Sequence, residues 1–157
     1  MAIIDNSLEN GYTVDWAADV SEPGFQYSKG FAVIPAGVGE DAQNTEWSKW
    51  ETMSANSRRN MIANATEPIK EMEITQELRQ QGYDNYETTD DHGMLITGLY
   101  KDHNGNTFYK VKNSWNTDNI YDGYFFASAP FVAYKTLNIV VHKDAVPKDI
   151  RKKLGIK

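Results

Sequence analysis

The 157-residue sequence contains no cysteine. Disulfide bonds and metal sites built on thiolates are therefore excluded. The chain also lacks an apolar run of the roughly 18 to 20 residues that a membrane-spanning helix needs, and no signal-peptide pattern opens it. We expect a cytoplasmic protein without a membrane partner; a targeting signal would be missing if the chain is a fragment.

Basic residues are few and dispersed. There are 16 Lys and Arg against 22 Asp and Glu, which gives a net charge of −6, and the longest basic run is the triplet 151–153. Binding to nucleic acid needs clustered positive charge to neutralise phosphates, so nucleic acid is not an expected partner. The acidic residues Asp84, Glu87, Asp90 and Asp91 match no metal-ligand spacing. They predict a solvated acidic loop, and we expect neither a metal nor another cofactor.

What is present fits a single packed domain. Hydrophobic residues make up 40% of the chain and aromatic residues 12%, enough for one core at this length. Apolar and polar residues alternate over 12–19, which predicts a half-buried strand with Val14 and Trp16 on its core face. Further strands are predicted at 31–35, 123–127 and 136–142.

Helices are predicted at the start of the chain and in its middle. Residues 2–11 have Ile4 and Leu8 on one face, and Gly11 suits the left-handed position after a helix. No N-cap residue precedes this helix, so we expect the chain to start within a domain. Residues 37–90 are polar and predict a helical excursion, with short helices at 46–53, 57–63 and 75–81, the last ended by Gly82. Large apolar side chains expected to dock this excursion on the core are Trp47, Trp50, Met53, Met61 and Met72.

The strongest local signal is a β-hairpin. Residues 92–100 and 107–115 both resemble strands, and the Asn104-Gly105 pair between them favours a type I′ turn. Such a two-residue loop places His92 and Asn113 on one face, but about 13 Å apart along the strands. A longer loop centred on Asp102 and His103 places them directly opposite each other. The sequence leaves both loops open.

The two predicted strands contain sequence motifs that suggest a family. The segments DDHGMLITGLY and YKVKNSWNTDNIYDGYF resemble the paired His and Asn motifs of papain-like cysteine peptidases. With LENGYTVDWAADVSE near the start and LNIVVHKDAVPKDIRKKLG near the end, the chain is similar to the C-terminal half of the bleomycin hydrolase or aminopeptidase C branch. The resemblance implies an α+β, papain-like fold: an antiparallel, barrel-like β-subdomain with a helical insertion at about 37–90.

The resemblance also implies roles for individual residues. His92 would be the general base and the partner of a thiolate, and Asn113 the amide that orients its ring. Trp115 would shield their hydrogen bond from water. Apart from the resemblance, the negative charge of Asp91 beside His92 is expected to favour the imidazolium form of that histidine. The family usually has glycine after the tryptophan, where this chain has Asn116, a residue that tolerates left-handed backbone.

The nucleophile of this chemistry is absent from the chain, because there is no cysteine. In the family the cysteine lies in the N-terminal half, which nothing here resembles, so residues 1–157 are expected to form the His- and Asn-bearing C-terminal half and to be inactive alone. The expected partners are a cysteine-bearing N-terminal half, a peptide substrate in the complete enzyme, and further copies of the full-length protein in a homo-oligomer. The alternative is a non-catalytic papain-like module that binds peptides or a partner subunit. The first hypothesis predicts exposed apolar surface around His92 and Trp115.

Overall fold

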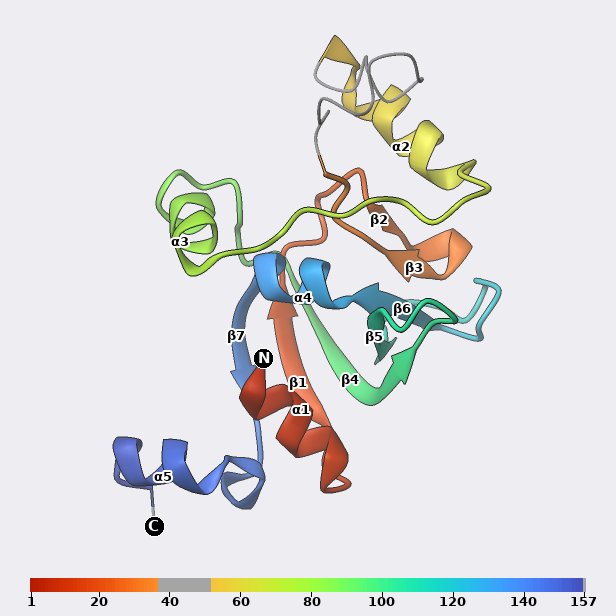
Figure 1. Ribbon diagram of the computed structural model, residues 1–157. Coiled ribbons are helices and arrows are strands. Elements are labelled where there is room, and N and C mark those ends of the chain that lie inside the picture. Colours follow the sequence, from red (N-terminus) through yellow and green to blue (C-terminus); the bar gives the residue numbers. More distant parts are fainter. Residues whose placement is uncertain (37–51, 157) are drawn as a thin grey trace.

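The computed structural model describes residues 1–36 and 52–156, and these form one sheet with helices packed on it. The strand order is β2-β3-β6-β5-β4-β1-β7, and Figure 1 shows the sheet curling along the bent strand β4. The strands are β1 (Val14–Ala18), β2 (Phe25–Gln26), β3 (Phe31–Ala32), β4 (His92–Lys101), β5 (Thr107–Lys112), β6 (Tyr124–Ser128) and β7 (Thr136–Val140). The helices are α1 (Ala2–Glu9), α2 (Ala55–Ala63), α3 (Gln76–Asp84), α4 (Ala129–Lys135) and α5 (Lys148–Leu154), with 3-10 turns η1 (Tyr27–Lys29) and η4 (Lys143–Ala145).

The concave face of the sheet holds the core. Val14, Trp16 and Ala18 of β1 are buried, as their alternation predicts. Trp16 packs edge-on against Phe131 of α4, and its indole N–H donates to the hydroxyl of Thr136 at 2.7 Å. Helices α1 and α4 lie against this face (Figure 1). The apolar alternation of β1 therefore places the centre of the core correctly.

The sheet departs from the predicted antiparallel pattern at one place. Strand β3 pairs with β6 in parallel, with Phe31 opposite Phe126. Parallel neighbours need a long crossover connection, and the chain between 33 and 123 provides it. Strand β3 is also shorter than the predicted 31–35, since beyond Ala32 only Pro35 forms an isolated bridge, with Glu71.

The first helix and most of the later ones agree with the sequence. Helix α1 ends before Gly11, whose φ of +79° is the left-handed conformation predicted for it. Helix α2 is one of the predicted helices of the excursion, and its anchor is the buried Ile62. Met72 packs against the core as expected, and Met53 and Met61 are half-buried. Residues 46–51 of the predicted helix 46–53, with Trp47 and Trp50, lie outside the described residues.

Helix α3 continues past Gly82, so the prediction that Gly82 ends it is wrong. The helix runs to Asp84, and a Cβ at position 82 would lie 2.9 Å from the Cε2 and hydroxyl of Tyr134. Glycine is therefore needed for close packing of α3 on α4, and not for a left-handed turn. Within the described part of the chain, none of these helices is long and apolar enough to cross a bilayer.

A buried lysine at the end of α4 ties this helix to the segment after β1 and to the segment before β4. The Lys135 side chain is 2% exposed and pairs with Glu22 and with Asp19, the latter at 3.7 Å. Its ammonium also donates to the backbone carbonyl of Glu87 at 2.7 Å. Asp19 in turn accepts from the backbone N–H of Thr89 at 3.1 Å. The end of β1 and the segment before β4 are thus joined around one buried cation.

Gly24 packs against backbone, and this gives a test of the β2–β3 corner. An added Cβ would lie 1.9 Å from the carbonyl oxygen of Val33. Gly24→Ala is therefore expected to lower the free energy of unfolding by about 3 kcal/mol, since backbone must move to relieve the overlap. The control is Gly93→Ala in β4, where nothing lies within 4 Å of the new Cβ and a change within about 0.5 kcal/mol is expected. Urea unfolding measures both, and equal effects would contradict the prediction.

Glu71 gives a test based on pH. Its carboxylate accepts from the backbone N–H of Ile34 at 2.8 Å and from the hydroxyl of Ser128. Burial raises the pKa of Glu71 above its ordinary 4.5, against the lowering effect of these two hydrogen bonds. Because the folded pKa is the higher one, this group's contribution to stability is complete below pH 4.5 and is lost as the pH rises through the folded pKa.

Glu71→Gln is therefore expected to gain stability relative to the parent as the pH rises above 4.5. The glutamine carbonyl can still accept hydrogen bonds but cannot ionise. Urea unfolding of both proteins between about pH 4 and pH 8 measures the difference. A difference that does not change with pH would show that Glu71 has the same proton affinity in both states.

Candidate active site: the His92–Asn113 pair

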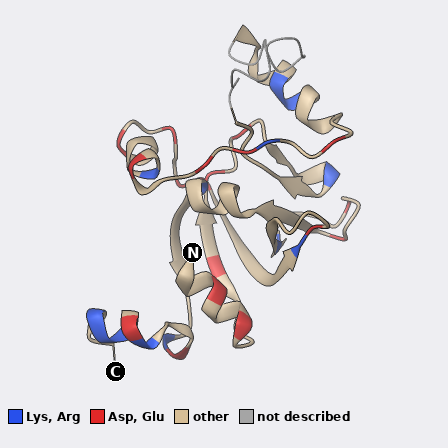
Figure 2. Ribbon diagram, in the orientation of Figure 1, with Lys and Arg blue, Asp and Glu red and all other residues tan. Residues whose placement is uncertain are grey.

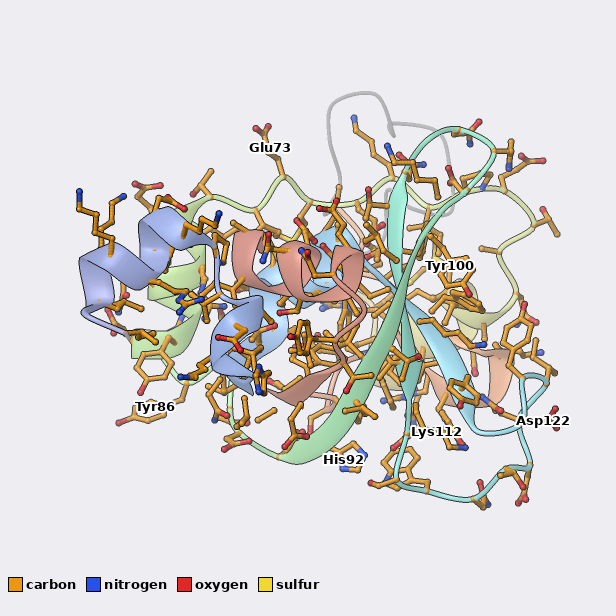
Figure 3. All side chains as sticks on the ribbon, turned by 90° about the horizontal axis from the view of Figure 1, so that it is seen from below. Glu73, Tyr86, His92, Tyr100, Lys112 and Asp122 are labelled. Carbon is orange, nitrogen blue, oxygen red and sulfur yellow. The ribbon has the colours of Figure 1, made fainter. Side chains whose placement is uncertain are left out.

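His92 and Asn113 are in direct contact. The Nε2 atom of His92 lies 2.7 Å from the Oδ1 atom of Asn113. His92 is the first residue of β4, and Asn113 directly follows β5, so the contact joins the open ends of the hairpin. Figure 3 shows His92 at the start of β4, at the edge of the molecule in that view. The half-buried ring is therefore accessible from outside the core.

The loop of this hairpin differs from both loops expected from the sequence. It has five residues, because Lys101 pairs with Thr107. The carboxylate of Asp102 accepts from the backbone N–H groups of Asn104 and Asn106 at 2.9 and 2.8 Å, which closes the loop. Gly105 takes a φ of +86° within it. The side chain of Asp102 therefore selects a loop that strand propensity alone does not predict.

A β-bulge then sets the pairing near the site. Gly98 lies opposite Lys110, whereas Ile96 lies opposite Val111, so one extra residue of β4 is accommodated between them. Beyond the bulge Leu95 faces Lys112, and the next pair in this register is Met94 with Asn113. His92 and Asn113 are then diagonal neighbours on one face, a separation that side chains can bridge. The predicted shared face is correct, and the expected 13 Å separation is not.

The hydrogen bonds of Asn113 define the tautomer of His92. Oδ1 of Asn113 also accepts from the backbone N–H of Ser114 at 2.8 Å, which identifies this atom as the amide oxygen. Since an amide oxygen only accepts, Nε2 of His92 must donate. The other ring nitrogen, Nδ1, then has a free lone pair in neutral histidine. The arrangement presents Nδ1 as a base with its ring held from behind.

Among the described residues, the amide nitrogen of Asn113 finds no hydrogen-bond partner. The residue is 2% exposed, and within the described part of the chain its Nδ2 makes no hydrogen bond. A buried donor without a partner costs free energy. In the same arrangement, Oδ1 is held rigidly between His92 and Ser114, so that it can orient the imidazole.

Trp115 covers the imidazole. The two ring centroids are 4.8 Å apart at an angle of 42°. Phe25 and Tyr27 support Trp115 from behind, both edge-on, at 5.8 and 5.2 Å. Trp115 is nevertheless 48% exposed. It is therefore a partial cover with one open side.

Asp91 has a different setting from the one predicted. Its carboxylate accepts from the backbone N–H of Val20 at 2.9 Å and from the hydroxyl of Ser21 at 2.6 Å. Both oxygens are thus bound to the segment between β1 and β2. These contacts anchor the start of β4, and the predicted electrostatic effect of Asp91 on His92 stays a prediction.

Sequence reasoning missed Phe25 and Tyr27. They lie about 90 residues from Trp115 in the chain, and the parallel pairing of β3 with β6 brings their segment to the site. A parallel contact of two residue pairs leaves no periodic pattern in the sequence, so no local signal could have identified these two aromatics.

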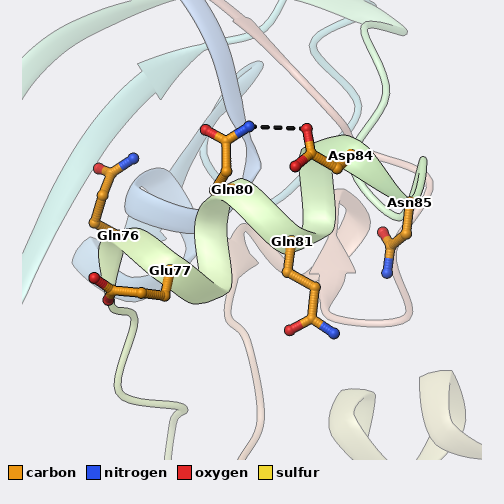
Figure 4. A pocket seen from close by; sticks show the side chains of 6 residues that line it. All are labelled: Gln76, Glu77, Gln80, Gln81, Asp84 and Asn85. Carbon is orange, nitrogen blue, oxygen red and sulfur yellow. Dashed lines mark hydrogen bonds between the residues drawn. The ribbon is translucent and has the colours of Figure 1, made fainter.

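Other chemistry is scarce in the described residues. No group of three or more His, Cys, Asp or Glu residues there could hold a metal ion. A hollow of about 700 Å³ lies along the polar side of α3, but the pair does not line it (Figure 4). Figure 2 shows basic residues gathered on α5, whereas acidic ones are spread over the chain. The lining residues of the hollow are Gln76, Glu77, Gln80, Gln81, Asp84 and Asn85.

The surface next to the pair is apolar in part. After Asn113, the chain exposes Trp115, Ile120 (66%) and Tyr121 (46%). Exposed large apolar side chains that gather at one place often mark a contact with another polypeptide. Among these side chains, the described ring contact with His92 is that of Trp115, so a larger exposed apolar surface around the pair stays a prediction.

Known peptidases are similar to parts of this chain. The model of the Peptidase C1-like family matches residues 46–156. Aminopeptidase C of Lactococcus lactis subsp. cremoris is 41% identical over 59 residues, which are 37% of this chain and 14% of the relative. Aminopeptidase C of Lactobacillus helveticus is 33% identical over 69 residues, 44% of this chain and 15% of the relative.

Solved structures add the fold. The crystal structure of PepW from Lactobacillus rhamnosis HN001 superposes with a TM-score of 0.57 at 19% identity, over 99% of this chain and 29% of PepW. The chain therefore spans less than a third of the length of these relatives.

Proposed function

Because the chain belongs to the Peptidase C1-like family and has its papain-like α+β fold, we propose that it is the C-terminal portion of a cysteine-type aminopeptidase. It would contribute His92 and Asn113, and a separate cysteine-bearing portion would contribute the nucleophile. The observation that carries the proposal is the 2.7 Å contact between Nε2 of His92 and Oδ1 of Asn113. The similarity to aminopeptidase C supports it. A closer kinship with bleomycin hydrolase belongs to the same proposal.

The proposed reaction is acyl transfer through sulfur. Nδ1 of His92 takes the proton of the partner's thiol, and the thiolate attacks the peptide carbonyl. The imidazolium returns this proton to the leaving amine as the carbon–nitrogen bond breaks, which leaves a thioester. Nδ1 then takes a proton from water as the water oxygen attacks the thioester carbon. The carbon–sulfur bond breaks, the carboxylic acid product leaves, and the imidazolium returns its proton to the thiolate. Asn113 keeps the ring oriented and stabilises its charged form.

The proposed function includes a domain organisation, a substrate and an oligomeric state. Residues 1–157 would form a single domain whose helical insertion spans about 37–90. The substrate is a peptide with a free amino terminus, and the complete enzyme is a cytoplasmic homo-oligomer. No cofactor takes part, since the sulfur, the imidazole and the amide complete the chemistry.

A second candidate is a non-catalytic module that binds peptides or a partner subunit. The observation that favours it is the absence of cysteine from the whole chain. Such a module would keep the contact between His92 and Asn113 as a structural feature. The two candidates differ in whether a supplied thiol becomes reactive.

The deciding experiment is reconstitution. The chain is mixed with the separately produced cysteine-bearing N-terminal half of an aminopeptidase C relative, and the release of aminomethylcoumarin from an aminoacyl substrate is followed. The first candidate predicts hydrolysis that needs both polypeptides and is lost when the partner's cysteine is changed to serine. Complex formation in a sedimentation experiment without hydrolysis would favour the second candidate. If the two polypeptides form no complex and no hydrolysis is seen, the first candidate is contradicted.

A further inference from the structure

Tyr27 reaches the site from a segment that the proposed mechanism does not use. It begins η1, directly after β2. Its hydroxyl donates to the backbone carbonyl of Asn116, and its ring lies edge-on to Trp115 at 5.2 Å and 82°. One side chain therefore contacts both the cover of the imidazole and the residue that follows it.

The backbone of Tyr27 is bound to the same loop. Its carbonyl accepts from the Nδ2 atom of Asn119 at 3.1 Å. Asn119 is itself buried, donating to the carbonyl of Tyr124 at 2.6 Å and accepting from the N–H of Gly123 at 2.7 Å. The loop from Asn116 to Gly123 is thus fixed to η1 at two points, and Trp115 lies at the start of that loop.

Trp115 depends on such support because almost half of its surface is exposed. Among the described residues, its ring contacts are His92, Phe25 and Tyr27. Phe25 fixes the ring from one side only. The hydroxyl of Tyr27 adds a fixed point on the backbone next to the ring, which limits rotation of Trp115 away from the imidazole.

We propose that Tyr27 is a positioning residue that holds Trp115 over the His92–Asn113 hydrogen bond and so keeps water from it. The hydroxyl stays a donor, because burial, followed by the negative charge of Asp118, raises the pKa of Tyr27. The importance of Tyr27 for catalysis rests on the proposed function. Its effect on the hydrogen bond can be measured in this chain alone.

The test is the exchange of the Nε2 proton of His92 with water, followed by NMR of the chain with ¹⁵N-labelled histidine. Tyr27→Phe keeps the ring and removes only the hydroxyl. It is expected to speed this exchange roughly three- to tenfold, the factor that corresponds to losing one ordinary hydrogen bond. Tyr27→Leu, which also removes the ring, should speed it further. The nitrogen shifts report whether Nε2 still carries the proton in each variant.

The control is Tyr100→Phe, which removes an exposed tyrosine hydroxyl on β4 and should leave the exchange unchanged. A purely structural role for Tyr27 would lower the urea midpoint without faster exchange in the folded state, and this result would overturn the proposal. A parent protein in which Nε2 carries no proton would overturn it as well. If the exchange results hold and reconstitution fails, the proposed function is wrong, but the positioning role is not.

Discussion

Replacing His92 by alanine is expected to lower kcat/KM of the reconstituted peptidase about 10³-fold. The variant has no group to take the thiol proton or to protonate the leaving amine, and general acid–base catalysis contributes roughly 10² to 10⁴-fold in enzymes. The loss should appear in kcat with little change in KM, because the imidazole acts on the reacting atoms. The measurement is the steady-state rate of aminomethylcoumarin release at saturating partner half.

The matched control is His103→Ala. This second histidine is exposed in the five-residue loop of the hairpin and should be replaceable without effect on the rate. Asn113→Ala is expected to fall between the two, since the ring remains but is no longer held at Nε2. A His92→Ala complex that retains more than about a tenth of the parent rate would show that another group is the base.

Replacing Lys135 by alanine is expected to lower the free energy of unfolding by about 3 to 5 kcal/mol, the usual cost of removing one partner from a buried ion pair. The change leaves the carboxylates of Asp19 and Glu22, 5% and 25% exposed, without their cation. It also removes the donor to the carbonyl of Glu87. Urea unfolding at neutral pH measures the loss.

Lys152→Ala on the exposed side of α5 is the control for this prediction. The same atoms are removed from the surface, so a change within about 0.5 kcal/mol is expected. If Lys135→Ala costs no more than Lys152→Ala, the buried cluster contributes nothing net. Its desolvation would then cancel its attraction.

The sequence predicted the parts of the fold that have regular patterns. The alternation of apolar residues in β1 predicted which of its residues are buried. The hairpin motif predicted β4 and β5, with His92, Asn113 and Trp115 on a common face. Both depend on the twofold period of side chains along a strand, which neighbouring elements rarely override. The motifs shared with the papain-like family predicted the overall fold.

Contacts between distant segments could not be predicted in this way. Gly82 has the appearance of a helix stop, but it is needed where α3 meets Tyr134. Likewise, the sequence does not reveal that Asp91 anchors the start of β4 by binding Val20 and Ser21. In each case the deciding partner comes from another element, and single-sequence patterns contain no information about that partner.

The irregularity in β4 between Ile96 and Gly98 has a consequence for how this site tolerates insertions and deletions. In a regular ladder that starts from Lys101 opposite Thr107, His92 would project to the same side as Lys112 and Ser114, away from Asn113. The unpaired residue corrects this parity. Shortening the strand by that single residue would therefore disconnect base from amide without altering either, whereas changing the turn by two residues would preserve their common side. The number of residues between His92 and Asn113, as much as their identity, brings the two side chains together.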